Sequence, residues 1–368
     1  MNELINRKMT KKVIVGDVPV GGGEPIPIQS MTTTKTHDLD ATMREVERLE
    51  EAGCQIIRIT VPDKKAAAVL PEIKKRMTVP LVADIHFNYR MALAAVDAGA
   101  DKIRINPGNI GGKERVKEVL DKVKGANLPI RIGVNAGSLE KDLIEKYGFP
   151  TPKAMVESAS RHIKVCMEYD FDDIIVSLKA SDVNLMIASY KLFAKQYDYP
   201  LHLGVTEAGP TKSGSIKSAL GIGSLLLDGI GDTIRVSLTD DPVEEVRVGY
   251  EILKSLGLAS RGATIVACPT CGRLEVDLFK IASEMEEELK NVKTPMSIAL
   301  MGCAVNGPGE ASHTDLGIAF GNGAGHLYYK GKNLGKVKES DAMDSLKDLI
   351  TQYEEEQKQL SNKEEIRG

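Results

Sequence analysis

The chain has 368 residues, 42% of them hydrophobic, and a formal net charge of -4 at pH 7. This length exceeds the usual size of a single hydrophobic core, so we expect two domains. The small negative charge excludes the general basic surface that nonspecific nucleic-acid binding requires. The N-terminal segment is polar and no run approaches the ~18 apolar residues of a membrane span, so we expect a cytoplasmic protein without membrane contact.

Short runs rich in β-branched residues alternate with amphipathic stretches in the first two thirds of the chain. The first predicted helix shows the pattern, because Asp38 or Asp40 can cap its start and Gly53 suits its end. Eight strands with intervening helices fit a (β/α)8 TIM barrel, with a doubly wound α/β sheet as the alternative. The predicted strands cover residues 26–32, 56–62, 81–87, 102–106, 130–135, 173–179, 201–207 and 232–237.

The pattern changes after Leu258, where Ala-Ser-Arg-Gly is typical of a linker. The segment that follows contains four predicted strands, at residues 264–267, 296–301, 316–320 and 326–330. It also contains two predicted helices, at residues 274–291 and 341–359, so we expect a small α+β domain. The predicted domains are a barrel at residues 1–258 and an α+β domain at residues 259–368.

Polar side chains recur at alternate positions along most of the barrel strands. Residues two apart share a face of a strand, and a strand of a parallel barrel is normally apolar on both faces. The charged faces therefore point into the upper lumen, where barrel active sites lie and where arginines suit phosphate oxygens. The residues that share such faces are Arg58 with Thr60, Asp84 with His86, Lys102 with Arg104 and Asn106, Arg131 with Asn135, Ser177 with Lys179, and Thr233 with Arg235 and Ser237.

Four arginines in one lumen indicate a polyanionic ligand. The alternative is that they pair with carboxylates of the chain itself, such as Asp84, Asp101, Asp232 or Glu207. The loop at residues 207–215 is a second candidate for phosphate binding, because it contains Lys212 and leads into a predicted helix. A plain surface turn is the alternative interpretation of this loop.

Three of the five cysteines follow predicted strands of the second domain. The pair Cys268-Pro-Thr-Cys271 ends one strand and Cys303 ends another, so loop amides can donate to sulfur and lower the thiol pKa values. Three thiolates can hold three corners of a cubane iron–sulfur cluster. Zinc bound by these cysteines and His313, or a redox-active dithiol, are the alternatives. The other two cysteines lie in the barrel half and are expected to be buried hydrophobes: Cys54 and Cys166.

Five long motifs are spread over both halves of the chain. They are Gln29-Ser-Met-Thr32, Ala83-Asp-Ile-His-Phe87, Arg104-Ile-Asn-Pro-Gly-Asn-Ile-Gly111, Cys268-Pro-Thr-Cys-Gly-Arg273 and Met301-Gly-Cys-Ala-Val-Asn-Gly-Pro-Gly-Glu310. These motifs closely resemble those of the 4-hydroxy-3-methylbut-2-enyl diphosphate synthase family. The similarity spans about residues 10 to 355 and fits the two-domain bacterial form of that family.

The resemblance implies the reductive ring opening of 2-C-methyl-D-erythritol 2,4-cyclodiphosphate in the non-mevalonate isoprenoid pathway. It implies a [4Fe-4S] cluster bound by Cys268, Cys271 and Cys303, with a carboxylate oxygen of Glu310 as a displaceable fourth ligand. Ferredoxin or flavodoxin would donate the electrons. The cluster domain of one subunit would close over the barrel of another, which implies a head-to-tail homodimer.

The resemblance also implies that the cyclic diphosphate binds in the mouth of the barrel. The substrate-binding residues implied by it are Arg58, Arg104, Asn106, Arg131, Asn135, Lys212, Arg235 and Ser237, to which the polar faces of the strands add Asp84 and Lys179. We expect Glu310 to act in catalysis by releasing the reacting iron. Glu207 and His86 are the expected proton donors.

Two competing hypotheses come from other classes of protein. One is a phosphate-binding barrel lyase or transferase with a structural zinc domain. The other is a C-terminal binding module with no catalytic part. A brown, iron- and sulfide-containing protein would separate the cluster enzyme from both, because a zinc site is colourless.

Overall fold

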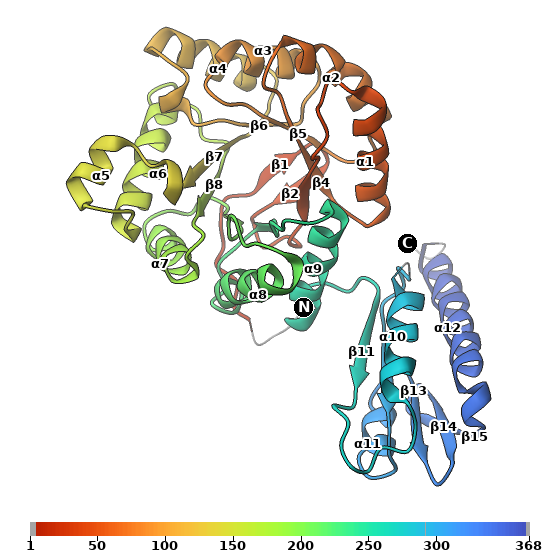
Figure 1. The fold of residues 1–368 in the computed structure, drawn as a ribbon. Coiled ribbons are helices and arrows are strands. Elements are labelled where there is room, and N and C mark those ends of the chain that lie inside the picture. Colours follow the sequence, from red (N-terminus) through yellow and green to blue (C-terminus); the bar gives the residue numbers. More distant parts are fainter. Residues whose placement is uncertain (1–4, 291, 366–368) are drawn as a thin grey trace. The chain divides into compact units, whose positions relative to one another are not determined.

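The structure is a computed structural model that describes residues 5–290 and 292–365 (Figure 1). Residues 1–4 of the polar N-terminal segment, and residue 291 at the end of a predicted helix, lie outside the described residues. The chain forms two compact units, Met1–Ala259 and Ser260–Gly368. Within the described ranges, no helix combines the length and the apolar character that a membrane span requires.

Eight parallel strands form the barrel of the first unit. Six of them make one sheet in chain order: β3 (Gln29–Met31), β4 (Ile56–Thr60), β5 (Leu81–Asp84), β6 (Lys102–Arg104), β7 (Ile130–Asn135) and β8 (Ile174–Lys179). The short strands β9 (His202–Leu203) and β10 (Thr233–Ile234) pair with each other. Bridges from Leu201 to Val176 and from Ile234 to Ile28 join this pair to β8 and to the start of β3. Each predicted run contains one strand, so the TIM barrel is confirmed.

Helices surround the barrel strands (Figure 1). In α1, the Asp38 side chain accepts from the backbone N–H of Ala41 at 3.0 Å, and Met43, Val46 and Leu49 are buried against the strands. The helices are α1 (Leu39–Glu51), α2 (Lys64–Arg76), α3 (Tyr89–Asp97), α4 (Lys113–Gly125), α5 (Lys141–Tyr147), α6 (Pro152–Met167), α7 (Val183–Ala194), α8 (Thr211–Leu227) and α9 (Pro242–Ser255). Two single turns of 3-10 helix follow β6 and β7, at η1 (Pro107–Asn109) and η2 (Ala136–Ser138).

An N-terminal hairpin that the sequence analysis does not predict closes one end of the barrel. Strands β1 (Val13–Val15) and β2 (Val18–Val20) pair antiparallel. Val13, Val15 and Val20 pack in one buried cluster with residues near the amino ends of barrel strands: Ile56, Val82 and Ile175. The lumen is therefore apolar at this end, and its polar part lies toward the carboxyl ends of the strands, where barrel enzymes place their sites.

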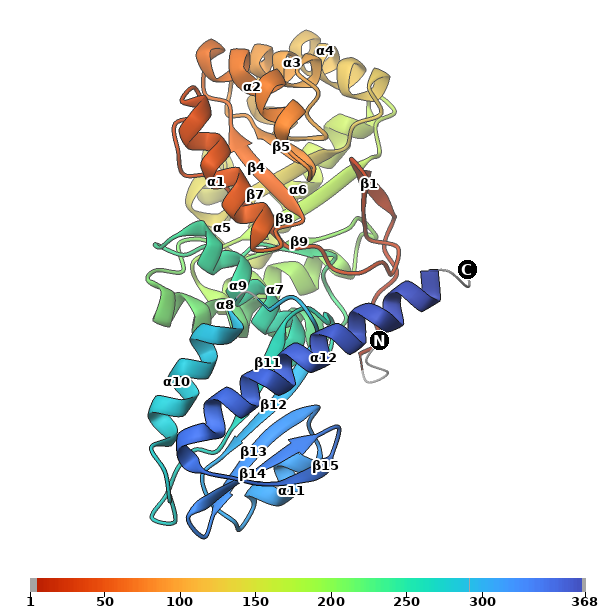
Figure 2. The same cartoon turned by 90° about the vertical axis from the view of Figure 1, so that its right-hand side faces the viewer.

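The second unit is an α+β domain around a five-stranded sheet (Figure 2). The strands, in spatial order, are β11 (Ala263–Ala267), β12 (Met296–Met301), β13 (Leu316–Gly321), β14 (Ala324–Tyr329) and β15 (Lys332–Val337). The first three are parallel, and β14 and β15 add an antiparallel hairpin. The predicted α+β fold is confirmed, although β15 is absent from the prediction because its residues are polar and mostly exposed.

Helices cover both faces of this sheet. Ile298 and Leu300 pack on one face against α10 (Leu278–Leu289) and α12 (Ala342–Glu365). Ala299 and Met301 pack on the other face against the short helix α11 (Gly307–Ser312). A single turn, η3 (Glu339–Asp341), precedes α12. Helix α11 is also absent from the prediction, because its sequence Gly-Pro-Gly-Glu-Ala-Ser has a low helix propensity.

Candidate functional site

A polar cavity of about 150 Å³ lies in the upper lumen of the barrel. Basic, hydroxyl and amide side chains line it, together with one carboxylate and one glycine. The lining residues are Arg58, Asp84, His86, Arg104, Arg131, Gly133, Asn135, Ser177, Lys179, Thr206, Arg235 and Ser237. Eight of the ten predicted substrate-binding residues are among them, and so is the predicted proton donor His86.

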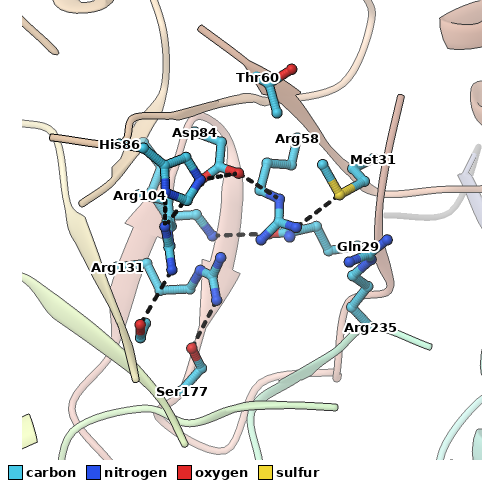
Figure 3. A network of polar contacts seen from close by, with 12 residues as sticks. Gln29, Met31, Arg58, Thr60, Asp84, His86, Arg104, Arg131, Ser177 and Arg235 are labelled. Carbon is cyan, nitrogen blue, oxygen red and sulfur yellow. Dashed lines mark hydrogen bonds and ion pairs between the residues drawn. The ribbon is translucent and has the colours of Figure 1, made fainter. Parts of the chain in front are cut away.

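Asp84 is the centre of a polar network on the β4–β6 side of the cavity (Figure 3). Its Oδ2 lies 3.8 Å from Arg58 Nε and 3.4 Å from His86 Nε2, and its Oδ1 lies 3.5 Å from Arg104 Nη1. Burial raises the pKa of this carboxyl, but the cations of Arg58 and Arg104 and the hydrogen bond to His86 outweigh burial and hold it below its usual value. Asp84 is therefore an anion that orients two arginines.

Two other arginines of the cavity have different partners. Arg235 pairs with Glu245 of α9 at 3.2 Å, and Ser30 donates to the same carboxylate at 2.8 Å. Arg131 donates to Ser177 Oγ at 2.8 Å, while its Nε and Nη2 have no hydrogen-bond partner among the described residues. The sequence analysis left open that all four arginines pair with carboxylates of the chain. Arg58, Arg104 and Arg235 do so, but Arg131 does not.

Gly133 on β7, and Gly204 directly after β9, leave room for basic side chains. A Cβ atom at Gly133 would lie 2.8 Å from Arg104 Nε, and one at Gly204 would lie 2.7 Å from Lys179 Nζ. Real Cβ atoms essentially never show contacts this short, so a larger residue would displace the cation, and at Gly204 it would also meet the Arg235 backbone oxygen at 2.5 Å. Gly133 lies on the same face of β7 as Arg131 and Asn135. This alternation could have indicated from sequence that Gly133 faces the lumen and leaves space there.

Positive charge exceeds negative charge inside the barrel. Six basic side chains are buried there or line the cavity, and the carboxylates that contact them among the described residues are Asp84 and Glu245. The basic residues are Arg58, Lys102, Arg104, Arg131, Lys179 and Arg235. Burial, reinforced by neighbouring arginines, lowers the pKa of Lys102, Arg131 and Lys179 well below their ordinary values. Buried positive charge without a negative partner costs free energy. A bound polyanion would supply the negative partner, so this arrangement favours binding of a polyanion.

Three predicted residues are not part of the cavity lining. The amide of Asn106 bonds twice to Gly133, donating to its carbonyl oxygen at 3.0 Å and accepting from its N–H at 2.8 Å, so it joins the ends of β6 and β7. Lys212 is exposed in the first turn of α8. Glu207 is exposed in the turn after β9 and has a φ of +54°, a strained conformation for a side chain of this size.

Thr206 lines the cavity, but the sequence analysis does not select it, although it lies within the predicted strand at residues 201–207. Gln29, Lys102 and His202 form a further polar layer that the cavity does not reach. The sequence analysis places only Lys102 of this layer on a polar strand face, and it names Gln29 only as part of a motif. The signal for Gln29 and His202 is weak, because one polar residue in an apolar run does not reveal which way its side chain points.

The three predicted cysteine ligands lie at one edge of the second unit. Cys268 follows β11 and Cys303 follows β12, and these strands are adjacent and parallel, so their carboxyl ends meet at the same edge. The N–H of Cys268 donates to Leu300 O at 3.0 Å. Cys271 is exposed, and Thr270 beside it has a φ of +62°. Glu310 lies in α11, which begins four residues after Cys303.

The chemistry of these donors suits an iron–sulfur cluster. Backbone N–H groups of Val305 and Asn306, together with the side chain of Arg273, lower the pKa of the Cys303 thiol, although its burial opposes them. A thiolate is the form that binds iron. Among the described residues, no three His, Cys, Asp or Glu side chains converge tightly enough to hold a metal ion. Cys54 and Cys166 are buried in the barrel unit, as expected.

The fold and the site define a TIM-barrel enzyme with a separate domain that presents three cysteines. The chain belongs to the GcpE family. Residues 10–250 match the GcpE TIM-barrel domain, and residues 264–352 match the GcpE protein C-terminal domain. The resemblance identified in the sequence motifs is therefore confirmed, and the family does not support the alternative of a lyase or transferase with a zinc domain.

Curated relatives match over the whole chain. A protein of Bacillus licheniformis is 55% identical over 100% of both chains, and one of Geobacillus kaustophilus is 56% identical over 100% of this chain and 99% of its own. A protein of Listeria monocytogenes is 57% identical over 97% of both chains. All three are named 4-hydroxy-3-methylbut-2-en-1-yl diphosphate synthase (flavodoxin).

Among solved structures, dihydropteroate synthase of Yersinia pestis is 17% identical with a TM-score of 0.48, and the match covers 67% of this chain and 99% of that chain. Because the TM-score is below 0.5, this likeness adds nothing to the assignment of fold or function.

Proposed function

We propose that this chain catalyses the reductive ring opening and dehydration of 2-C-methyl-D-erythritol 2,4-cyclodiphosphate to 4-hydroxy-3-methylbut-2-enyl diphosphate. It is an iron–sulfur oxidoreductase of the non-mevalonate isoprenoid pathway, and its cofactor is a [4Fe-4S] cluster. The single structural observation that supports this substrate is the excess of buried positive charge around the barrel cavity. A cyclic diphosphate brings the negative charge that this cavity lacks.

In this proposal the barrel unit binds the diphosphate. Guanidinium groups donate paired hydrogen bonds to phosphate oxygens, and unpaired donors of Arg131 are already directed into a buried site. Asp84 orients Arg58 and Arg104 without contacting phosphate. The other groups proposed to bind the substrate are Asn106, Asn135, Lys179, Lys212, Arg235 and Ser237.

The second unit binds the cluster in this proposal. Cys268, Cys271 and Cys303 would hold three irons, and the Glu310 carboxylate would hold the fourth. When bound, the cluster supplies single electrons and one iron whose oxygen ligand can be displaced. Because no three of these side chains converge on a metal position in the described residues, assembly of the cluster would require the ligand loops to rearrange.

Proton transfer and partners complete the proposal. His86 lies at the cavity and Glu207 lies in the turn after β9, and either can hold a proton near the bound substrate. Flavodoxin, which the names of the relatives specify, or ferredoxin would donate the electrons. A head-to-tail homodimer would bring the cluster unit of one subunit to the barrel of the other, in the cytoplasm.

The test is anaerobic turnover. Protein purified without oxygen should be brown, contain about four irons and four sulfides per chain, and convert the cyclodiphosphate when reduced flavodoxin is supplied. The variant Arg131→Met should keep its iron and sulfide but lose substrate turnover. A colourless protein that contains zinc, or a cluster protein that leaves the cyclodiphosphate unchanged, would contradict the proposed function.

A further inference from the structure

A fully buried polar layer crosses the barrel between the cavity and the apolar hairpin. Lys102 precedes Arg104 by two residues on β6, and it pairs in register with Val82, which belongs to the hairpin cluster. Lys102 and His202 have no exposed surface, and Gln29 is 1% exposed. Lys102 is therefore a basic group that neither solvent nor the cavity reaches.

The partners of Lys102 are weak. Its Nζ lies 3.5 Å from Gln29 Oε1, at the outer limit of a hydrogen bond. Among the described residues, Gln29 Nε2 and both ring nitrogens of His202 have no hydrogen-bond partner. The layer thus contains polar atoms whose hydrogen-bonding capacity is unused, and such atoms in a buried site indicate a change of state or bound water.

Every charged group nearest to Lys102 from the surrounding strands is a cation. Arg58 on β4 and Arg131 on β7 oppose its positive charge, and no carboxylate of the described residues offsets them. The two carboxylates of the lumen are engaged elsewhere: Asp84 of β5 by Arg58, His86 and Arg104, and Glu245 of α9 by Arg235. The neighbours on the other strands are Gln29 on β3, Lys179 on β8 and His202 on β9, none of which is negative.

Arginine keeps its proton in proteins, so the excess charge can be relieved only at a lysine or histidine. Burial, followed by repulsion from Arg131 and Arg58, lowers the pKa of Lys102 well below its ordinary value. A dianion in the cavity would offset the charges of these same two arginines, because both line it. The part of the pKa shift that comes from their repulsion would then disappear, whereas the part that comes from burial would remain.

We propose that Lys102 is a neutral amine in the substrate-free barrel and takes up a proton when the cyclic diphosphate binds. The inference rests on the proposed function, since it needs an anionic ligand above Arg58 and Arg131. Lys102 is a positioning residue in this scheme, because it contacts no substrate atom. Its role is to match the charge of the site to that of the ligand, so that affinity depends on pH.

Lys179 and His202 are the other groups that could take up this proton. Lys179 lines the cavity, where it can meet a phosphate oxygen directly. Burial and the charges of Arg235, Arg131 and Arg58 lower its pKa, and the negative charge of Glu245 offsets only part of this shift. The two ring nitrogens of His202 have no acceptor nearby, and repulsion from Lys179, Arg131 and Lys102 adds to burial in lowering its pKa. Among the described residues, no carboxylate favours the protonated form of Lys102. A bound anion would favour it indirectly, by offsetting the charges of Arg58 and Arg131.

The test is calorimetric titration of the anaerobic holoenzyme with the cyclodiphosphate, without an electron donor so that no turnover occurs. Each phosphorus of a cyclic diphosphate carries one strongly acidic oxygen, so the ligand itself does not titrate near neutral pH. Heats measured in two buffers of different ionisation enthalpy give the number of protons taken up. Uptake of a full proton would weaken binding about tenfold for each pH unit of increase.

Three proteins are compared: the unchanged chain, Lys102→Met and the control Lys124→Met, which alters an exposed lysine of α4. We expect proton uptake in the unchanged chain and the control, and binding without uptake in Lys102→Met. Two results would overturn the inference: proton uptake that persists in Lys102→Met, and binding without proton uptake in the unchanged chain. Either result would leave the proposed function intact. Absence of any binding heat would overturn the proposed function, and this inference with it.

A second measurement does not depend on the folding of Lys102→Met. In protein labelled at the lysine ε-carbon, carbon-13 spectra should show a lysine signal at the position of a neutral amine. Addition of the cyclodiphosphate should move it to the position of an ammonium group, and the signal should be missing from Lys102→Arg. A spectrum in which every lysine is an ammonium before the ligand is added would refute the inference.

Discussion

The guanidinium of Arg104 occupies the space that a side chain at Gly133 would fill. Its Nη2 donates to the carbonyl oxygen of Gly133 at 3.2 Å, and a Cβ atom at Gly133 would come within 2.8 Å of its Nε. The position of this arginine is therefore set by a glycine on the next strand and by Asp84 on the preceding one. A small backbone feature thus decides where a cavity cation lies.

Substitution of Gly133 by Ala should displace Arg104. Because the added methyl group meets a confined side chain, we expect a loss of about 1–3 kcal/mol in the free energy of unfolding. The affinity for the cyclodiphosphate should fall by about tenfold or more, since a bidentate charged contact is moved. Calorimetric titration and thermal unfolding measure the two effects.

Gly137 is the matched control, because a Cβ atom there meets nothing within 4 Å. Gly137→Ala should change neither quantity appreciably. Equal affinities of Gly133→Ala and the unchanged chain would show that Arg104 does not bind the diphosphate.

Replacement of Asp84 by Asn should destabilise the barrel. Breaking a buried ion pair costs about 3–5 kcal/mol, because the partner charge remains buried without compensation. Here Arg58 and Arg104 would both lose their shared carboxylate. Chemical unfolding at pH 7 measures the loss. The exposed pair of Asp121 with Lys117 provides the control, since Asp121→Asn should cost less than about 1 kcal/mol.

The effect of Asp84 on stability should depend on pH in a defined direction. The folded-state pKa of this carboxyl lies below its unfolded value of about 3.9, so its contribution is fully present above that value. The contribution is lost as the pH falls through the folded-state pKa. The difference between the unchanged chain and Asp84→Asn should therefore be constant from pH 5 to pH 7, to within about 0.5 kcal/mol, and narrow in stronger acid. A difference that widens in acid would refute this assignment.

The proposed cluster ligands can be separated by their effects on iron content and on turnover. Each single change of Cys268, Cys271 or Cys303 to Ser should lower bound iron and sulfide, because a thiolate ligand is lost. Glu310→Ala should retain a cluster but lose turnover, since in the proposed function its carboxylate oxygen would be the ligand of the iron that reacts. Cys166→Ala, a change at a buried cysteine of the barrel unit, should retain both. Full turnover by Glu310→Ala would exclude this role for Glu310.

The proposed head-to-tail homodimer predicts complementation between two inactive variants. Arg131→Met damages the barrel site and Glu310→Ala damages the cluster site. In a mixed dimer, one intact barrel would face one intact cluster unit, so co-expressed variants should recover about a quarter of the unchanged activity. No recovery, with mixed dimers verified by two affinity tags, would indicate that the barrel and cluster of one chain work together.

His162 supports the loop that follows β6. Its Nδ1 accepts from the N–H of Gly108 at 3.1 Å, and its Nε2 lies 3.3 Å from Glu140 Oε1. Burial raises the pKa of Glu140, but the hydrogen bonds from His162 and Ser158 outweigh it and hold that pKa at about 2. His162→Ala should therefore speed hydrogen exchange in residues 106–112 by at least about tenfold while the strands of the barrel remain protected. Unchanged exchange in that loop would show that other contacts hold it.

The strands of the barrel could be located from sequence because each is a short apolar run, and most have polar residues at alternate positions. The carboxyl ends of parallel strands meet at one edge, so the spacing of Arg58, Arg104, Arg131 and Arg235 was enough to place them in one lumen. The hairpin β1–β2 could not be found in this way. Its short valine runs gain their stability only from contacts with Ile56, Val82 and Ile175.

The sequence by itself determined the barrel, the α+β domain, the family and the three cysteines, because these depend on periodicity, spacing and residue type. Only the tertiary structure decided which charges meet. It pairs Arg235 with Glu245, a residue of α9 that shows no pattern of its own, and it leaves Lys102 without a carboxylate. Pairing of charges depends on strand register and on the space left by glycines such as Gly133, and neither can be read from residue order along the chain.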